Sequence, residues 1–557
     1  MSMIDSTKPS LSKLPASHQN VVWNLTESVL TILSSLTDIN GHITEALSKI
    51  SVIPSFLFGV LELSMAPDSV NEAAMLCLYS MIAEGWGLAE QLAERSDWLQ
   101  RVSNLSNKSD VIGIAACGVI YEINAIGADT AIPSGLSVLK LLDAQLDRHC
   151  FRAASDAEKL VTHASLLEDE KGLGLVLELI ASIAADTQIG AESGLLFEDD
   201  DFEGFADDDD MEQSLPGDVE GVGSRNVHDS DSDATSDGMD DDTDRGPATG
   251  TAPSNADNGS SPPPSSLQGY ETLQGFLTNS TTPKVLSLFR ACSHVPSNSD
   301  TCRPFRGAFP SKPFSSIRDL LLQTLTSIAW TLTTATLLTG LRLQWQIQAQ
   351  EIWETVVTPV LSSDSADIEL ASSITSLAWG VSRSVDGRIN LVNDEHKKFM
   401  SLHQASVSLP REPVTGKDTS LHPDGPDASL GVKCIGVLGS LALSSHQIAQ
   451  NREIGAFLLA ILNNLPQTPA EDAIEVLNQM FDVYADKEFD YDDPVFVQGG
   501  FLAYLQALQP KVQRMAKGVD KRKAPILRGR ADEAVANLKR FIKYKMEEGS
   551  ISEAMNI

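Results

Sequence analysis

The sequence predicts an all-α fold in which helical repeats stack into a solenoid that a long, acidic, disordered loop interrupts. Three observations lead to this prediction. Apolar residues recur at spacings of three and four along most of the chain, which gives each helix a buried face. The helical patterns come in pairs at intervals of about 40 residues, as in armadillo and HEAT repeats. The stretch from Glu198 to Asp244, called the acidic segment below, is instead dense in carboxylates.

Armadillo/HEAT-like repeats are expected between residues 19 and 193, after a polar and disordered start at residues 1–18. The first helix carries Val22, Leu25 and Val29 on one face. An ordinary all-helical globule is the alternative, but so many moderately apolar helices in series need neighbours on both sides. Further helices are expected at residues 43–63 with an interruption at Pro54, and at 71–92, 110–125, 136–146, 154–166 and 173–185.

The middle of the chain is expected to lack repeats. Residues 194–266 combine the acidic disordered loop with a Pro/Ser-rich linker, and residues 267–312 form a partly ordered connector. HEAT-like repeats then fill residues 313–557, with a disordered linker near 399–430 and a basic C-terminal helix. Helices are expected at residues 270–288, 317–345 with a break near Gly340, 352–361, 368–381, 432–443, 448–462, 470–484, 495–508 and 531–545.

One of these helices has a well-defined predicted start, at Thr468 to Glu471. The Thr468 hydroxyl is expected to cap a free backbone amide, and Pro469 fits the first turn, where its missing amide hydrogen costs nothing. Glu471 then completes a capping box.

The acidic segment holds 20 acidic residues and one basic residue, Arg225, so it carries −19 of the chain's net charge of −35. Its carboxylates are spaced by roughly 8 Å in an extended chain, which is about the Debye length in physiological salt, so they repel each other. The segment therefore forms no core and is expected to stay open until a basic partner neutralises it.

Charge and composition restrict the partners and the compartment. A chain this acidic repels nucleic acid and anionic membranes and favours basic proteins, and nothing points to more than a monomer. The six cysteines include no CxxC pair, and no signal peptide is visible, which favours cytoplasm and nucleus. The longest apolar stretch, residues 328–343, is broken by threonines, a glycine and Arg342, so no transmembrane helix is expected.

No constellation of residues supports catalysis or a cofactor. The phosphate-binding, nucleophile-elbow and zinc-protease motifs are absent, so the chain is not expected to be an enzyme or to bind a cofactor. Cys292, His294 and Cys302 would give only three zinc ligands at a spacing that fits no common finger. Asp490, Asp492 and Asp493 lack the glycine and the glutamate of a calcium loop, so helix capping is the better interpretation.

Three phenylalanines at the start of the acidic segment suggest a docking motif. Their rings would bury on a partner while the carboxylates pair with its Lys and Arg side chains. The frayed end of the preceding helix is the alternative. The candidate partner-binding residues are Phe197, Glu198, Asp199, Asp200, Asp201, Phe202, Glu203, Phe205, Asp207, Asp208, Asp209, Asp210, Asp240, Asp241 and Asp242.

Ser230 is a candidate phosphorylation site. It lies among acidic residues and has Asp233 three positions later, as acid-directed kinases prefer. Phosphorylation would deepen the negative charge of the segment.

The C-terminal end is basic. From Lys511 to Lys545 there are 12 basic and three acidic residues, and the densest point is Lys521-Arg522-Lys523. The solvated face of a terminal repeat is the simplest interpretation. A weak nuclear signal, or a counter-surface for the acidic segment in the unliganded protein, are the alternatives.

Several motifs in the C-terminal third, and one near the start, resemble those of a known family, the symportins. The order of armadillo-like repeats, acidic loop and HEAT-like repeats matches as well. The motifs are Val476-Leu477-Asn478-Gln479-Met480-Phe481-Asp482-Val483-Tyr484-Ala485-Asp486, Tyr491-Asp492, Val495-Phe496-Val497, Asp520-Lys521-Arg522-Lys523, Asn537-Leu538-Lys539-Arg540-Phe541-Ile542, Tyr544-Lys545 and Val22-Trp23-Asn24-Leu25-Thr26.

The resemblance implies an adaptor of ribosome biogenesis. Symportins carry the two basic large-subunit ribosomal proteins of the 5S ribonucleoprotein into the nucleus together, shield them as a chaperone and deliver them to assembly. An import receptor of the transportin type reads a signal in a basic N-terminal arm. Here the first 20 residues contain only Lys8 and Lys13, so the arm is expected to be missing and receptor binding is not implied for this chain.

The sequence therefore predicts a nuclear import adaptor and dedicated chaperone for the basic ribosomal proteins of the 5S particle. An acidic chaperone for histones or other basic nuclear proteins is the first alternative. A general HEAT-repeat scaffold, in which the acidic segment is an incidental linker, is the second.

Overall fold

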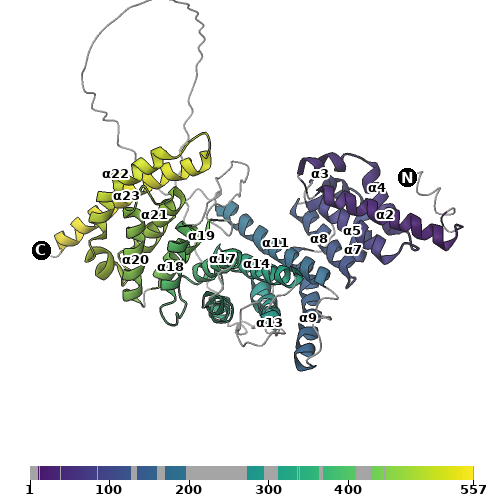
Figure 1. Ribbon diagram of the computed structural model, residues 1–557, viewed down its shortest axis with the longest axis horizontal. Helices are drawn as coiled ribbons and strands as arrows, with labels where there is room; N and C mark the ends of the chain where they lie inside the picture. The colour runs from purple at the N-terminus through teal and green to yellow at the C-terminus, as the bar shows by residue number, and fades with distance from the viewer. Residues whose placement is uncertain are drawn as a thin grey trace, which may run out of the picture. The chain divides into compact units, whose positions relative to one another are not determined.

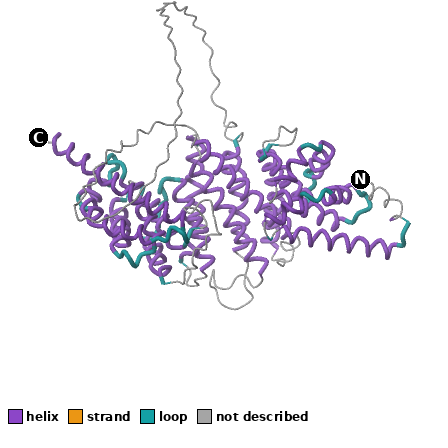
Figure 2. Tube along the Cα trace, turned by 90° about the horizontal axis from the view of Figure 1, so that it is seen from above, coloured by secondary structure: helices purple, strands orange, loops and turns teal. Residues whose placement is uncertain are grey.

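The computed structural model is all-helical wherever it is described, and no described residue lies in a strand (Figures 1 and 2). The chain divides into two units, and the second, Leu196–Ser266, lies wholly outside the described residues. The described residues are 11, 13–37, 39, 41–83, 86–126, 134–159, 170–195, 272–293, 312–334, 337, 339–362, 368–408, 428–444 and 447–555.

The N-terminal half repeats a unit of three helices. After the helix α2, one unit comprises two short helices and a longer one, and the next unit has the same order. The helices are α2 (Ala16–Thr37); α3 (Gly41–Ser48), α4 (Val52–Glu62) and α5 (Asp68–Ala83); α6 (Trp86–Ala93), α7 (Ser96–Leu105) and α8 (Val111–Ala125); then α9 (Gly135–Lys159) and α11 (Glu170–Leu195).

The C-terminal half continues with paired helices. π-Helical turns interrupt two of these helices, and a third π-helical turn lies in the connection between α21 and α22. The elements are α12 (Leu273–Phe276), η2 (Leu277–Thr281), α13 (Thr282–Ser293), α14 (Lys312–Thr334), α15 (Thr339–Ile352), η3 (Trp353–Val357), α16 (Thr358–Leu361), α17 (Ile368–Ser384), α18 (His396–Val407), α19 (Leu430–Ala442), α20 (Ile448–Asn463), α21 (Ala470–Tyr484), η4 (Asp492–Val497), α22 (Phe501–Gly518) and α23 (Pro525–Met555).

One row of helices runs through both halves. In the order α2, α5, α8, α11, α14, α17, α19, α21 and α23, each helix packs directly against the next. The remaining helices, among them α7, α13, α18, α20 and α22, line the other side of this row. The continuous hydrophobic core lies between the two layers, and this is the architecture of a helical-repeat fold.

Helix α8 shows why the row forms. Asp110 caps it, since its carboxylate accepts a hydrogen bond from the Gly113 amide over 3.0 Å. Every residue from Ile112 to Ile120 is buried, because helices pack on all sides of α8. A helix apolar all round needs such neighbours, which a repeat stack provides.

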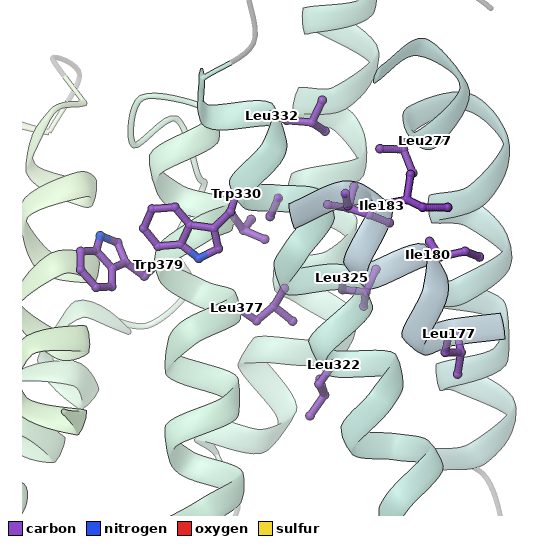
Figure 3. Packing of buried hydrophobic residues seen from close by; sticks show 14 of the residues in the cluster. Leu177, Ile180, Ile183, Leu277, Leu322, Leu325, Trp330, Leu332, Leu377 and Trp379 are labelled. Carbon is purple, nitrogen blue, oxygen red and sulfur yellow. The ribbon is translucent and has the colours of Figure 1, made fainter. Parts of the chain in front are cut away.

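Glycines allow large side chains of one row helix to lie on the next. Trp330 of α14 contacts α17 at Gly380, where a Cβ atom would come within 3.0 Å of the indole ring. Trp379 of α17 lies on Gly436 of α19 in the same way, where a Cβ would come within 2.1 Å. The two indoles meet edge to face, 5.2 Å apart (Figure 3).

Several boundaries differ from those that periodicity predicts. Residues 71–92 form two helices rather than one, and residues 136–146 join the following pattern in the single helix α9. The linker expected from residue 399 is wrong at its start, because Phe399 is fully buried inside α18. The predicted cap is also wrong, because the Thr468 hydroxyl donates to the Ile461 carbonyl over 2.6 Å instead of capping α21. Residues 409–427 lie outside the described part.

Among the described residues no single helix is long and apolar enough to cross a membrane. By length and composition alone, the two helical segments His42–Ser48 and Val52–Glu62 would together be long and apolar enough, but the pair is bent by 72° at its break. Leu57 and Phe58 of this pair are buried in the core of the protein.

Candidate surfaces for a basic partner

The acidic segment is inserted between two helices that touch each other. Helix α11 ends at Leu195, the chain is next described at residue 272, and α14 then packs along α11. Two threonine hydroxyls of α14 reach carbonyls of α11: Thr331 donates to Ala184 over 2.6 Å, and Thr324 lies 3.1 Å from the Leu177 carbonyl. Each hydroxyl shares its hydrogen with a carbonyl of α14 itself, over 2.8 Å in both cases. The insertion therefore leaves the row of helices uninterrupted.

Leucines and tryptophans fill the space between these helices. Figure 3 shows them interdigitating around α14, which lies between α11 and α17. The side chains labelled there are Leu177, Ile180 and Ile183 of α11, Leu277 of η2, Leu322, Leu325, Trp330 and Leu332 of α14, and Leu377 and Trp379 of α17.

All the partner-binding residues predicted from the sequence, from Phe197 to Asp242, lie outside the described residues, and so does Ser230. Their roles stay predictions. The described structure fixes only where the insertion leaves the row, after Leu195, and where it returns, before Leu273.

The structure brings together a second acidic site, which periodicity does not reveal. We call it the tyrosine–carboxylate cluster. It comprises Tyr79 of α5, Tyr121 and Glu122 of α8, and Glu178 and Asp186 of α11, so it spans three successive helices of the row. The Tyr121 hydroxyl donates a hydrogen bond to the Asp186 carboxylate over 3.1 Å, and the Tyr79 ring lies on Gly118 of α8.

The electrostatics of this cluster favour a cation. Partial burial raises the pKa of Glu178 and of Asp186. The pKa of Tyr79 is raised by burial first and then by the negative charges of Glu122, Glu178 and Asp186. Among the described residues, neither Glu178 nor Asp186 forms an ion pair. A Lys or Arg side chain would stabilise the charged form of these partly buried carboxylates and would stack on the tyrosine rings.

Spacing gives a weak sequence signal for the cluster. Glu178 and Asp186 are two helical turns apart, and they are the charged residues of the mainly apolar stretch from Leu173 to Gly190. The sequence alone cannot show that Tyr79 and Tyr121, from two other helices, reach the same place.

A second set of buried carboxylates, on α21, has a structural role. Burial raises the pKa of Glu475 to about 7, and the Gln479 side chain donates a hydrogen bond to Glu475 over 2.7 Å. Asp472 is fully buried and lies 3.2 Å from the His403 ring nitrogen. These groups pack α21 against its neighbours and are not accessible to a partner.

The predicted basic end is only partly a solvated face. Lys545 is buried and forms ion pairs with Asp492 at 3.2 Å and with Glu548 at 3.0 Å. Asp492 therefore pairs with a lysine and caps no helix, because η4 has no side-chain cap. In contrast, Lys521 and its two neighbours are exposed.

The described residues contain no group of His, Cys, Asp and Glu that could hold a metal ion. Of the three residues considered for zinc, Cys292 is buried in α13, and His294 and Cys302 lie outside the described part.

Comparisons with known proteins give the chain's relatives. Residues 314–549 match the family model described as "SYO1-like, TPR repeats". The chain is 29% identical to Symportin 1 of Chaetomium thermophilum over 589 aligned residues, which cover 97% of this chain and 79% of the relative. It is 41% identical over 128 residues to Synchronized import protein 1 of Saccharomyces cerevisiae, which covers 23% of this chain and 20% of that protein.

A third relative carries the repeat class in its name. The chain is 39% identical over 116 residues to the "Armadillo repeat protein involved in nucleocytoplasmic transport Syo2" of Schizosaccharomyces pombe, which covers 21% of this chain and 17% of that protein. The all-helical repeat fold predicted from the sequence and the resemblance of the chain to the symportins are both confirmed. The chain is a homologue of the symportins.

Proposed function

We propose that this chain is a nuclear import adaptor and chaperone that binds the basic ribosomal proteins of the 5S particle and delivers them to ribosome assembly. The observation that carries the proposal is the position of the acidic segment, a charge of −19 inserted between helices that remain packed together. The insertion can bind and release a partner without disturbing the scaffold.

The names of two relatives support a role in transport. The budding yeast protein is named for synchronized import, and the fission yeast protein for nucleocytoplasmic transport. The proposal extends this role to the present chain, which would shuttle between cytoplasm and nucleus.

The physical chemistry suits a carrier. Free ribosomal proteins hold dense Lys and Arg side chains that bind nucleic acid without selectivity. The acidic segment competes for those charges through many weak contacts, each of which exchanges quickly. The tyrosine–carboxylate cluster adds a fixed site on the folded scaffold where one basic segment of the cargo can anchor.

Co-purification tests this proposal. The chain is isolated from its own cells under low salt, and the bound proteins are quantified by mass spectrometry. We expect enrichment of the two 5S-associated ribosomal proteins over other ribosomal proteins and over histones. A matched preparation lacking residues 198–244 should lose most of them.

The alternative functions give different outcomes. Equal or greater recovery of histones would replace the proposal with a general acidic chaperone for nuclear proteins. An unchanged set of partners after removal of residues 198–244 would favour the plain helical scaffold.

A further inference from the structure

Two clusters of exposed cations lie on the last repeat, which α22 and α23 form. The turn between the two helices carries the first cluster, and the exposed side of α23 carries the second. The six side chains, called the basic surface below, are Lys521, Arg522 and Lys523 in the turn and Lys539, Arg540 and Lys543 on the helix. Among the described residues none of the six forms an ion pair.

The carboxylates between these cations have partners of their own. Asp520 accepts hydrogen bonds from two backbone amides of the turn, over 2.8 and 3.4 Å. Asp532 pairs with Arg528 at 2.8 Å. Burial lowers the pKa of Arg530, and the charge of Glu533 acts against this shift. The basic surface therefore sets six positive charges against one carboxylate, Asp520, that no cation pairs.

The fold already uses the apolar side of α23. Leu538, Phe541 and Ile542 are buried, and the Phe541 ring lies 5.1 Å from the ring of Phe481 on α21. A basic helix binds a membrane surface by inserting a free apolar face into it. Because the apolar face of α23 is covered, an anionic membrane is a poor partner for the basic surface.

An acidic protein is also a poor partner. Protein interfaces are organised around buried aromatic and aliphatic anchors. Between Lys521 and Lys543, all of which the structure describes, a single large apolar side chain is exposed, that of Ile526. A phosphate backbone needs no such anchor, because Lys and Arg bind it through charge and hydrogen bonds.

The distance between the two clusters calls for a polymeric anion. Lys539 lies 14 residues after Pro525, where α23 begins, so about 20 Å of helix separate the clusters. A phosphate ion or a single nucleotide contacts one cluster at a time. A stacked nucleic acid strand carries one phosphate about every 3.4 Å, so a segment of roughly six nucleotides spans both clusters.

An exposed aromatic ring lies next to the second cluster. Tyr544 follows Lys543 and keeps 36% of its surface exposed. Its hydroxyl donates a hydrogen bond to the Glu548 carboxylate over 2.9 Å, which holds the ring in place. Unpaired bases stack on rings of this kind beside cations. The ring therefore favours a single strand over a duplex.

The net charge of −35 opposes nucleic acid binding only as an average over the chain. In physiological salt, charges are screened over about 8 Å. A strand on the basic surface therefore responds chiefly to the side chains that it touches, and these are the six cations.

We propose that the basic surface binds a single strand of RNA through its phosphates, with one cluster at each end of the bound segment. The choice of RNA over DNA rests on the proposed function, which brings the chain to ribosome assembly. The recognition of phosphates does not, because it follows from charge and spacing. The same surface repels a basic cargo, so RNA and cargo occupy different parts of the protein and can be bound together.

Fluorescence anisotropy of the full-length chain with a labelled RNA strand tests the proposal. K521Q/R522Q/K523Q and K539Q/R540Q/K543Q should each weaken the binding of a strand of about 20 nucleotides by about tenfold at about 0.1 M salt. Each should also lower the slope of log affinity against log salt by about 2, because three fewer phosphates are neutralised. The matched control K13Q/K108Q/K487Q removes the same charge at exposed, scattered lysines and should bind like the wild type.

Shorter and different probes test the spacing and the kind of strand. A trinucleotide is too short to bridge the two clusters, so it should bind far more weakly, and each triple variant should lose little more. An RNA duplex should bind more weakly than the single strand, and photocross-linking of RNA that contains thiouridine should place the contacts in the turn and on α23. Equal binding of single-stranded DNA would support the phosphate site and overturn the choice of RNA.

Other outcomes overturn the inference as a whole. Equal weakening in the control variant would show an effect of net charge, and cross-links confined to other helices would place the RNA elsewhere. Tighter binding of a Glu-rich peptide, or of vesicles with anionic lipids, would assign the surface to a protein or a membrane. RNA binding without enrichment of ribosomal proteins would retain this inference and count against the proposed function, and the converse result would do the reverse.

Discussion

The Thr331 hydroxyl of α14 donates a hydrogen bond to the Ala184 carbonyl of α11 over 2.6 Å, across an insertion that contains most of the chain's negative charge. One helical heptad earlier, Thr324 makes the same contact with Leu177. The two helices thus stay in register although 116 residues separate Leu195 from Lys312, where α14 begins. The pair forms a junction that holds the two halves of the row together.

The first prediction concerns this junction. T331V keeps the shape of the side chain but removes the donor, so it should lower the free energy of unfolding by about 1 kcal/mol. Urea denaturation monitored by circular dichroism measures the change. The control is T326V on the same helix. The buried Thr326 hydroxyl donates to Leu322 within α14 over 2.7 Å, as the Thr331 hydroxyl also does to Ser327 over 2.8 Å, so the control removes the bond within the helix alone. Equal losses of unfolding free energy in both variants would mean that the contact between α11 and α14 adds nothing to stability.

The second prediction concerns the stacking of Trp379 on α19. G436A places a methyl group where a Cβ would lie 2.1 Å from the indole, so the ring or the helix has to move. Such overpacking costs about 1–3 kcal/mol. G529A is the matched substitution, since Gly529 lies in helix α23 with nothing within 4 Å of the new methyl group. It should stabilise the protein by about 0.5–1 kcal/mol. If G436A left the free energy of unfolding unchanged, the close contact between Trp379 and Gly436 would be contradicted.

The fold class was predictable because the apolar spacing of helices such as α21 is a local property. The expected range 470–484 agrees with the observed helix Ala470–Tyr484. The predicted helix boundaries were wrong where tertiary contacts determine where a helix begins or ends. Phe399 looked like the start of a polar linker, but its ring packs in the core beside Trp353, 5.9 Å away, and the helix continues around it. The Thr468 hydroxyl was expected to cap α21, but it binds a carbonyl of α20.

The candidate site was predictable only in part. The acidic segment is visible from composition, since charge density needs no fold to recognise. The tyrosine–carboxylate cluster is not, because Tyr79 and Asp186 are more than 100 residues apart and meet only when α5, α8 and α11 stack. The exposed Lys521 and its neighbours and the buried Lys545 likewise belong to one basic run, and only the fold separates them.

The third prediction is a pH dependence of stability that arises from Glu475. Burial raises its pKa in the folded state to about 7, above the ordinary value of 4.5. The folded state therefore binds more protons than the unfolded state between these values, so Glu475 favours folding below pH 4.5 and progressively loses this contribution as the pH rises through 7. E475Q should be more stable than the wild type at pH 8, by on the order of 3 kcal/mol, and nearly equal to it at pH 5.

Urea denaturation between pH 5 and 8.5 measures this effect. E62Q, at an exposed position, is the control and should follow the wild type at every pH. The acidic segment titrates in all three proteins, so the difference between E475Q and the wild type isolates the buried group. A difference that does not change with pH would show that Glu475 stays ionised in the fold.

The fourth prediction concerns the tyrosine–carboxylate cluster. E178Q/D186N removes two charges beside Tyr79 and Tyr121 without changing side-chain size. The affinity for a Lys/Arg-rich peptide should fall about tenfold at low salt, since each charge contributes up to about 1 kcal/mol. Fluorescence anisotropy measures it. E90Q/E94Q removes two exposed charges from α6 and the residue after it, and it should change the affinity little. An equal loss in both variants would show a general charge effect.

The fifth prediction concerns the acidic segment itself. Replacing Asp207 to Asp210 by Asn removes four of its negative charges. Binding of a basic ribosomal protein should weaken by about tenfold at low salt, and the dependence of the affinity on salt should become less steep, because fewer ions are exchanged on binding. Titrations at several salt concentrations give both quantities for each protein.

The control removes the same number of charges from the folded scaffold, in the variant E62Q/E90Q/E94Q/D490N, whose four positions are exposed. If the segment binds the cargo, only the Asn variant flattens the salt dependence. Equal flattening would mean that the cargo responds to net charge alone, and the segment would then be no more than one part of an acidic surface. Unchanged affinity of the Asn variant across the whole salt series would remove Asp207 to Asp210 from the cargo site, because carboxylates in contact with a cation cannot be neutralised without loss of this electrostatic attraction.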